Sequence, residues 1–130
     1  ADEFFAVFKH PPAAVEAAVA IQRAVRDYDW PAGGAVRLRV GVHSGRPTLT
    51  EGGYVGLAVH ATARVSAAAH GGQILVTDAA ARAIGQSLAK TLRFVELGTF
   101  HLRGLPEQET LYQVSVGDLP ARFPPPVTLD

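Results

Sequence analysis

The spacing of apolar residues changes along the chain, and each change predicts a new element of secondary structure. The run EFFAVF at residues 3–8 is short, apolar and aromatic. We expect it to form a buried strand, although a run of this length does not by itself distinguish a strand from a buried helix. After Pro12, apolar side chains recur at helical spacing up to Trp30. That repeat predicts an amphipathic helix whose buried face contains Val15, Ala18, Val19, Gln22 and Val25.

An alternation of period two follows this helix. In AVRLRVGVHSG, valine and leucine at positions 36, 38, 40 and 42 alternate with arginine and glycine, which predicts a strand with one face in the core. We expect residues 43–56 to form a projecting hairpin and residues 57–69 to form a second, alanine-rich helix. The glycines at positions 71 and 72 tolerate positive φ and end that helix, and QILVTD is the next expected strand.

The last third of the chain predicts a short helix, a run of strands and an irregular tail. Asp78 is the expected N-cap of a helix over AAARAIG. LRFVEL, TFHLRG and TLYQV are then expected as strands separated by Gly98 and by Gly104-Leu105-Pro106. The proline-rich tail, residues 118–130, has no periodic pattern. We expect it to be poorly ordered, with packing along a neighbouring surface as the alternative.

Composition narrows the class of protein. The 130 residues are 48% hydrophobic and 18% charged, with 12 basic and 12 acidic side chains, as in one soluble globular domain. This balance argues against a surface for nucleic acid. The apolar runs are too short to span a bilayer and no secretory signal is present, so we expect a cytoplasmic protein. Because the chain has no cysteine, any metal site must use oxygen or imidazole ligands.

Four segments together carry a resemblance to a known family: EFFAVF, RLRVGVHSG, YVGLAVHATARVSAAAHGGQILVTD and LGTFHLRGLPEQETLYQV. In this order they resemble the catalytic domain of class III nucleotidyl cyclases, in its actinobacterial form. The resemblance implies an α/β (α+β) domain with a ferredoxin-like βαββαβ core, whose first strand is absent from this chain. It makes residues 1–117 the cyclase homology domain. It also implies a head-to-tail homodimer with active sites built from both subunits.

The reaction that the resemblance implies is cyclisation of a nucleoside triphosphate to the 3′,5′-cyclic monophosphate and pyrophosphate. The family uses two divalent metal ions, Mg²⁺ or Mn²⁺, which are held by two aspartates. ADEFFAVF places Asp2 at the second aspartate position, and the first position is not in this chain. An ordinary turn carboxylate is the alternative for Asp2.

His60 and Arg64 are four residues apart on the second expected helix, so they share one face and can reach the same phosphate or ribose. By the resemblance, Arg64 neutralises charge that develops on the triphosphate, a task that suits a planar guanidinium. The family commonly has asparagine at the position of His60, where it orients the ribose. We expect His60 to take this orienting role, with an ordinary polar helix residue as the alternative. The other histidines lack the mutual spacing of zinc ligands.

Base recognition is only partly represented in the sequence. The family reads adenine with an upstream lysine and with an aspartate or threonine at the position of Gly53, which has no side chain to accept a hydrogen bond. Gly53 is equally expected to supply turn geometry to the hairpin. Arg103 lies near the phosphate-binding lysine of relatives, whose best-aligned position here is Leu105. ATP is the favoured substrate and GTP is the alternative.

A second class of function also fits the sequence. The residues at positions 53 and 60, together with the missing first aspartate, fit a cyclase-like module that has lost activity and serves dimerisation or nucleotide sensing. Arg64 and Asp2 occupy their expected places, and they favour the enzyme.

Overall fold

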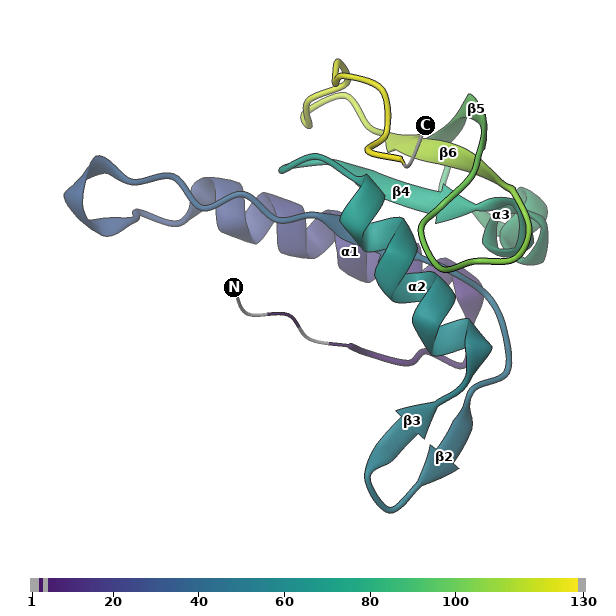
Figure 1. Ribbon diagram of the computed structural model, residues 1–130. Helices are drawn as coiled ribbons and strands as arrows, with labels where there is room; N and C mark the ends of the chain where they lie inside the picture. The colour runs from purple at the N-terminus through teal and green to yellow at the C-terminus, as the bar shows by residue number, and fades with distance from the viewer. Residues whose placement is uncertain (1–2, 4, 129–130) are drawn as a thin grey trace.

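The computed structural model describes residue 3 and residues 5–128. Figure 1 shows how the helices and strands are arranged in space. None of the described helices is long and apolar enough to cross a bilayer. The elements in chain order are α1 (Pro11–Asp27), the 3-10 helix η1 (Pro31–Gly33), β1 (Val40–Val42), β2 (Thr48–Thr50), β3 (Gly53–Val55), α2 (Leu57–Ala68), β4 (Ile74–Thr77), α3 (Asp78–Ile84), the 3-10 helix η2 (Gly85–Ser87), β5 (Arg93–Phe100) and β6 (Glu109–Ser115).

Four strands form one mixed sheet in the order β1-β4-β6-β5. β1 runs parallel to β4, whereas β6 is antiparallel to both of its neighbours. A parallel pair needs a crossover connection, and here that connection contains the β2–β3 hairpin and α2. All residues of β4 are buried, which explains why its sequence, ILVT, lacks the alternation typical of a half-buried strand. The expected α+β fold is confirmed.

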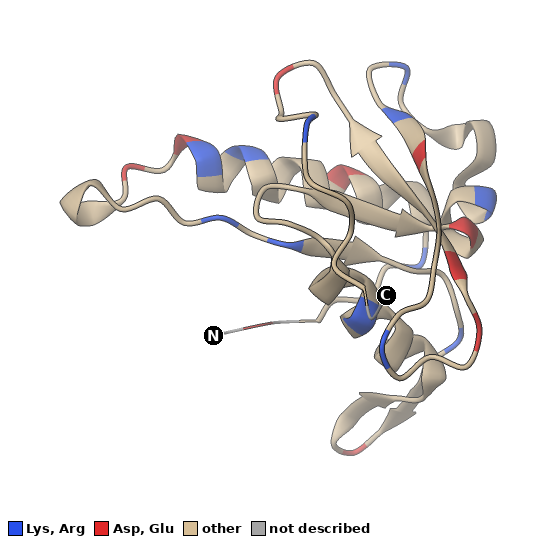
Figure 2. Ribbon diagram, turned by 45° about the horizontal axis from the view of Figure 1, so that its top comes forward, with Lys and Arg blue, Asp and Glu red and all other residues tan. Residues whose placement is uncertain are grey.

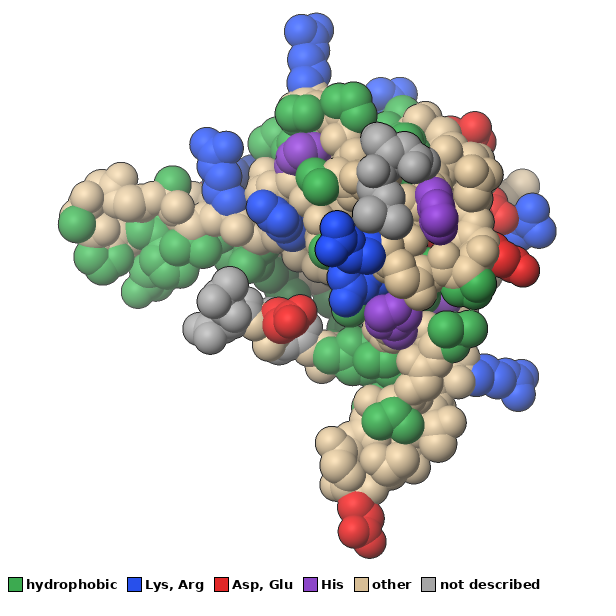
Figure 3. All heavy atoms as spheres, in the orientation of Figure 1, with side chains coloured by type: hydrophobic (Ala, Val, Ile, Leu, Met, Phe, Trp, Pro, Cys, Tyr) green, Lys and Arg blue, Asp and Glu red, His purple; other side chains and the backbone are tan. Residues whose placement is uncertain are grey.

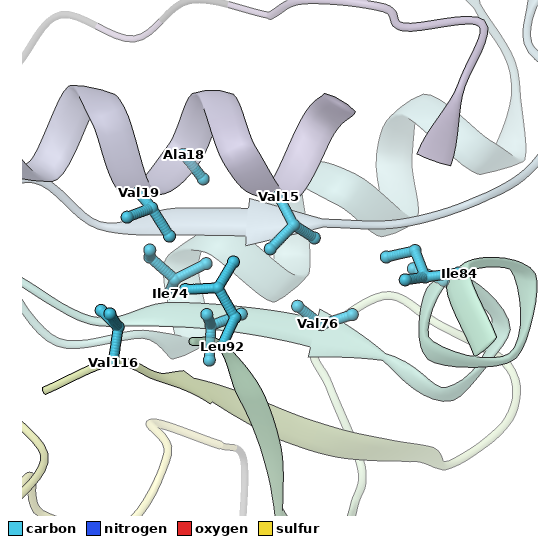
Figure 4. Close-up of a cluster of buried hydrophobic side chains, with 10 residues drawn as sticks. Val15, Ala18, Val19, Ile74, Val76, Ile84, Leu92 and Val116 are labelled. Atoms are coloured by element: carbon cyan, nitrogen blue, oxygen red, sulfur yellow. The ribbon is translucent and has the colours of Figure 1, made fainter. Parts of the chain in front are cut away.

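Helices cover both faces of this sheet. α1 and α3 pack on one face, over an aliphatic cluster that Figure 4 shows between α1 and β4. α2 packs on the opposite face, where Val65 belongs to a second cluster with Leu75 and Leu111. Successive side chains of a strand point to opposite faces. Ile74 and Val76 therefore enter the first cluster, whereas Leu75 enters the second.

The first helix follows the expected pattern closely. α1 begins at Pro11 with proline in its first turn, and Val15, Ala18, Val19 and Gln22 are its buried residues. Gln22 is a buried polar side chain that is satisfied, because its Nε2 donates to the carbonyl of Leu38 at 2.9 Å. This bond joins the helix to the segment that leads into β1.

The expected hairpin arm is also confirmed. β2 and β3 pair in an antiparallel ribbon that projects from the body of the protein (Figure 1). The Thr50 hydroxyl donates to the carbonyl of Gly53 at 2.9 Å across the turn. Gly53 has φ of 115°, a conformation that favours glycine. The arm presents Leu49 to solvent, and Leu57 at the base of the arm is exposed as well.

The expectation of a buried strand over EFFAVF is wrong for the described residues of this run. They contain no strand, and Phe5, Val7 and Phe8 are between 42% and 45% exposed. The ring of Phe5 lies 6.2 Å from the ring of Tyr54, centroid to centroid, so the run approaches the hairpin through side chains. A strand requires a neighbouring backbone to pair with, and an apolar run does not specify that neighbour.

Two expected boundaries are corrected by backbone and capping hydrogen bonds. The strand expected over positions 36–42 is only Val40–Val42, and Val36 is exposed. Thr77, rather than Asp78, is the N-cap of α3, since its Oγ1 accepts from the amide of Ala80. Asp78 lies in the first helical turn, where its carboxylate accepts from the Tyr112 hydroxyl at 3.0 Å.

Three strands are expected after α3, and the structure has two there, β5 and β6. β5 continues through Gly98, where the register with β6 shifts and φ is 128°, so this glycine marks a bulge and not the end of a strand. Residues 101–108 form the loop between β5 and β6. Leu102 and Leu105 turn inward from this loop and are buried under α2. The loop is therefore fixed to the sheet by its own apolar side chains.

The described part of the tail, residues 118–128, contains no helix or strand, as expected, but the expectation of poor order is wrong. Gln113 Nε2 donates to the carbonyl of Ala121 at 2.9 Å. The amide of Val127 donates to the carbonyl of Ala68 at 2.9 Å. The tail packs along the neighbouring surface, which was the alternative expectation.

Candidate active site

The hairpin delivers the chain directly into α2. Gly56, the N-cap of α2, has φ of 121° and supplies no side-chain cap. Only glycine adopts this conformation readily, so the chain turns sharply here between β3 and the helix. His60 and Arg64 follow on successive turns and share one face of α2, as their spacing predicts.

Arg64 is partly buried and lines a cavity of about 240 Å³ on the α2 side of the sheet. Its Nε is buried and has no hydrogen-bond partner among the described residues. Arg103, from the loop between β5 and β6, lines the same cavity. Figure 3 shows basic side chains gathered at the centre of the face that carries α2, with histidine side chains nearby. Two guanidinium groups that share a cavity are a suitable site for a polyanion.

His60 connects α2 to the loop that carries Arg103. Its Nε2 lies 3.2 Å from the carbonyl oxygen of Gly104. A carbonyl oxygen only accepts hydrogen bonds, so Nε2 carries the proton in this contact. The other ring nitrogen, Nδ1, takes no part in it. Gly104 has φ of 79°, and a Cβ at this position would lie 2.8 Å from His60 Nε2. The close approach of the ring therefore requires glycine at position 104.

The structure separates the two positions that the sequence offers for a phosphate-binding residue in this loop. Leu105 is buried in the cluster under α2. Arg103 is exposed and reaches the cavity that contains Arg64. The geometry thus brings together His60, Arg64 and Arg103, which come from segments far apart in the sequence.

Two other expected site residues are not brought to this cavity. Gly53 lies in the hairpin arm, and a Cβ built on it would meet no atom within 4 Å. Its surroundings fit the turn role, and the base-reading role stays a prediction. Asp2, the expected metal ligand, lies outside the described residues.

Two of the remaining histidines contact other segments of the chain. In the described residues, no three side chains of His, Asp or Glu lie together in a way that could hold an ion. His43 Nδ1 lies 2.8 Å from Thr77 Oγ1, and burial lowers the pKa of His43. His70 Nε2 lies 2.8 Å from the carbonyl of Pro125. These two histidines have structural partners.

Sequence reasoning missed the residues of the tail that complete the cavity. Val127 and Thr128 line it, together with Ala67, Ala68 and Leu102. The tail has no apolar period, and no motif marks these two positions. Only the three-dimensional path of the chain places them beside α2.

Comparisons with known proteins agree with this architecture, although no family model matches the chain. An uncharacterized protein of Mycobacterium tuberculosis is 34% identical over 124 residues, which are 95% of this chain and 41% of that protein. The chain thus spans less than half of this relative. A receptor-type adenylate cyclase of Trypanosoma brucei brucei is 33% identical over 86 residues, which are 62% of this chain and 7% of that protein.

Solved structures share the fold. An adenylate cyclase structure from Trypanosoma brucei, determined in the monomeric state, has a TM-score of 0.75 at 25% identity and covers 92% of this chain and 70% of its own. An adenylate/guanylate cyclase/hydrolase from Silicibacter pomeroyi has a TM-score of 0.70 at 29% identity, over 85% of this chain and 65% of its own. The guanylate cyclase domain from Catenaria anguillulae, solved with GTP, has a TM-score of 0.70 at 21% identity, over 85% and 62%. The mixed α+β fold of this chain is that of the class III adenylyl and guanylyl cyclase catalytic domains.

Proposed function

We propose that this protein is a nucleotidyl cyclase that converts a nucleoside triphosphate, ATP in preference to GTP, to the 3′,5′-cyclic monophosphate and pyrophosphate. One observation carries the proposal. In a chain with the cyclase fold, Arg64 and Arg103 line one cavity, and Arg64 Nε is buried without a partner among the described residues. A buried donor atom without a partner is costly. A phosphate oxygen that accepted a hydrogen bond from Arg64 Nε would offset that cost.

The proposed chemistry uses the two arginines as fixed positive charges. The ribose 3′-hydroxyl loses its proton to solvent, and its oxygen forms a bond to the α-phosphorus. The bond from this phosphorus to the oxygen bridging to the β-phosphorus breaks, and pyrophosphate leaves with the electron pair. Negative charge therefore shifts toward the leaving group, where Arg64 and Arg103 stabilise it. The planar fork of each guanidinium can donate to two oxygens at once.

His60 has an orienting role in this proposal. Its Nε2 donates to the Gly104 carbonyl and so holds the loop that presents Arg103. A general base for the 3′-hydroxyl would need a free ring nitrogen within hydrogen-bond reach of that hydroxyl. The observed contact supports His60 as a residue that positions the second arginine beside the first, and it leaves Nδ1 as the ring nitrogen that a base role would need.

The two divalent cations enter the proposal as a requirement to be tested. Asp2 is the only one of their expected ligands in the chain, and the described residues assemble no metal site of their own. No step above is assigned to an ion. The expected result is that turnover depends on added Mg²⁺ or Mn²⁺ and that Asp2→Asn abolishes this dependence together with activity.

The homodimer is proposed from the surface of the hairpin arm and its base. Leu49 and Leu57 are 67% and 66% exposed, and Tyr54 and Val55 are exposed beside them. Apolar side chains grouped in this way mark an interaction surface, and a two-fold pair buries the same patch of both subunits. Light scattering should report twice the chain mass, and Leu49→Asp should shift the protein toward monomer and lower turnover. A Leu49→Asp variant that remains dimeric would exclude the arm as the interface.

The central test compares two arginine variants. Arg64→Ala should lower kcat by about 10²-fold or more, the usual cost of losing a donor to developing charge, and raise KM much less. Arg93→Ala is the matched control, because Arg93 is exposed and lies outside the Arg64 cavity. Cyclic nucleotide formation from ATP and from GTP is measured for both. If the unaltered protein binds nucleotide in the presence of Mg²⁺ or Mn²⁺ but does not turn it over, the enzyme proposal is rejected. A nucleotide-sensing module would then be the function that fits.

A further inference from the structure

The described part of the tail forms one wall of the cavity that contains Arg64. We call residues 118–128 the strap. Val127 and Thr128, at the end of the strap, line this cavity. The amide of Val127 donates to the carbonyl of Ala68, one helical turn after Arg64. Figure 2 shows where the basic and acidic residues lie along the ribbon, including a basic turn within α2.

The beginning of the strap is held by several strong contacts. The carboxylate of Asp118 accepts from Arg23 Nε at 2.9 Å and from Arg23 Nη2 at 2.7 Å, in a bidentate pair. Arg26 Nη1 donates both to this carboxylate and to the Asp118 carbonyl, each at 2.9 Å. Gln113 Nε2 then binds the carbonyl of Ala121. Bidentate geometry favours these contacts, although Asp118 and its two arginines are exposed. This part of the strap is held by more hydrogen bonds than its end.

The end of the strap is held by far less. His70 Nε2 donates to the carbonyl of Pro125 at 2.8 Å, and the amide of Val127 donates to Ala68. The Val127 side chain is 54% exposed, so apolar burial adds little. The residues at positions 124–126 are all proline, which lack amide donors and favour a stiff, extended chain. The strap end can therefore move as one rigid unit when its hydrogen bonds to His70 and Ala68 break.

The size of the cavity indicates when the strap end must move. Pockets that enclose drug-sized ligands occupy roughly 300–1,000 Å³, whereas this cavity measures about 240 Å³ with Val127 and Thr128 in its lining. A nucleoside triphosphate belongs to the larger class. The space beside Arg64 is therefore small for a triphosphate while the strap end stays in place.

We propose that the strap is an autoinhibitory lid: its end, residues 124–128, closes the Arg64 cavity and must swing away before a polyphosphate binds. This inference rests on the proposed function for the identity of the ligand, but it rests on contacts within the chain for the closure. A lid of this kind lowers the apparent affinity for ligand by the fraction of molecules that are open. Breaking the two end contacts raises that fraction.

The first test measures the accessibility of Arg64 itself. The double variant H70A/V127P removes both hydrogen bonds of the strap end and leaves the Asp118 anchor untouched. Phenylglyoxal modifies accessible guanidinium groups, and peptide mass spectrometry reports the rate at each arginine. The rate at Arg64 should rise roughly ten- to a hundredfold, as expected for the loss of two net hydrogen bonds. Arg93 serves as the internal reference, and H10A, at an exposed histidine outside the strap, serves as the control variant.

The second test uses inorganic tripolyphosphate as the ligand probe. In the unaltered protein, ligand should speed hydrogen exchange at the Val127 amide, because ligand displaces the strap end from Ala68. A ligand that bound without moving the strap would leave this exchange unchanged or slow it. Calorimetric titration should show tighter binding by H70A/V127P than by the unaltered protein, by up to the same factor as the gain in accessibility.

The outcomes distinguish failure of the proposed lid from failure of the proposed enzyme function. Faster trypsin cleavage after Arg122 in H70A/V127P confirms that the strap end is released. If Arg64 modification is nevertheless unchanged, the strap does not close the cavity and the inference is overturned. If Arg64 becomes accessible but neither tripolyphosphate binding nor nucleotide turnover is found in any variant, the lid stands and the proposed function fails.

Discussion

The two faces of the sheet are built from different kinds of side chain. Under α1 and α3, the buried cluster is aliphatic, from Val15 on the helix to Ile74 and Val76 on β4, and α1 adds one buried amide, Gln22, which donates to the Leu38 carbonyl. Under α2, aliphatic residues share the interior with the buried amides of Gln73 and Gln113, which bond to each other at 2.7 Å. The partly buried arginine and the cavity are also on the α2 side.

This difference indicates a division of labour within one small domain. A mostly aliphatic face can pack closely and contributes stability with few polar groups to satisfy. A face with a buried donor atom that lacks a partner among the described residues gives up stability, and in the proposed function a bound ligand supplies that partner. Substitutions on the α1 side should therefore change the free energy of unfolding, and substitutions at the α2 site should change activity.

The largest expected effect on stability lies on the aliphatic face. Ile74→Ala should lower the free energy of unfolding by about 2–5 kcal/mol, because Ile74 is 2% exposed and its removal leaves a cavity between α1 and β4. Urea unfolding followed by circular dichroism measures this loss. Val36→Ala, at an exposed position, is the control and should change stability little. Equal losses for the two variants would refute the assignment of this face as the stabilising core.

Arg64→Ala should produce the reverse pattern. The variant loses turnover as described above, but its thermal midpoint should be unchanged or raised, because it removes a buried nitrogen that lacks a partner among the described residues. Differential scanning calorimetry and turnover are measured on the same preparation. A large fall in the thermal midpoint would instead identify Arg64 as a structural residue. It would contradict the expectation that substitutions at the α2 site change activity and not stability.

His60→Asn should have a smaller effect on turnover. If His60 positions the loop through Gly104, an amide donor can replace the ring, and kcat should fall by less than the ~10²-fold that loss of a general base costs. His60→Ala leaves the Gly104 carbonyl without its partner and should lower kcat further. Losses for His60→Asn as large as those for Arg64→Ala, with nucleotide binding intact, would identify His60 as a base.

The smallest effect is expected at the exposed anchor of the strap. Hydrogen bonds from Arg23 and then Arg26 hold the pKa of Asp118 well below its ordinary value. A carboxyl whose pKa is lower in the folded protein stabilises it above the unfolded pKa of ~3.9 and loses this contribution as pH falls through the folded value. Asp118→Asn should therefore lower the thermal midpoint slightly at pH 7 and not at all at the acidic end.

The salt dependence of that variant provides its control. Asp118 and both of its arginines are exposed, so their interaction is screened by solvent and salt. The difference between Asp118→Asn and the unaltered protein should shrink when salt is raised. A difference that persists at high salt would show that the anchor acts through packing and not through charge.

Local patterns were sufficient for much of the fold. The helical spacing of Val15, Ala18 and Val19 specified the buried face of α1, and the spacing of His60 and Arg64 specified one face of α2. Both predictions depend on residues within a few turns of one another. The antiparallel hairpin was also predicted locally, because its turn glycines and flanking strands are adjacent in the sequence.

Predictions failed where a segment depends on a distant backbone. The aromatic run that contains Phe5 has the composition of a strand, but a strand exists only when another backbone accepts its hydrogen bonds. The segment around Val36 alternates correctly and still lies outside the sheet. The pattern of apolar positions indicates which side chains prefer the core. It does not indicate whether a neighbouring strand is present for the backbone to pair with.

For this protein, sequence by itself determined that Arg64 lies on a helix face with His60, because 3.6 residues per turn is a local property of the chain. Tertiary structure alone decided that Arg103 shares the cavity with Arg64 and that Val127 and Thr128 of the strap line it as well. Beyond Asp118, the strap is held through backbone groups, such as the carbonyls of Ala121 and Pro125 and the amide of Val127. Nearly every residue carries such groups, so no side-chain pattern reveals in advance where they will bind.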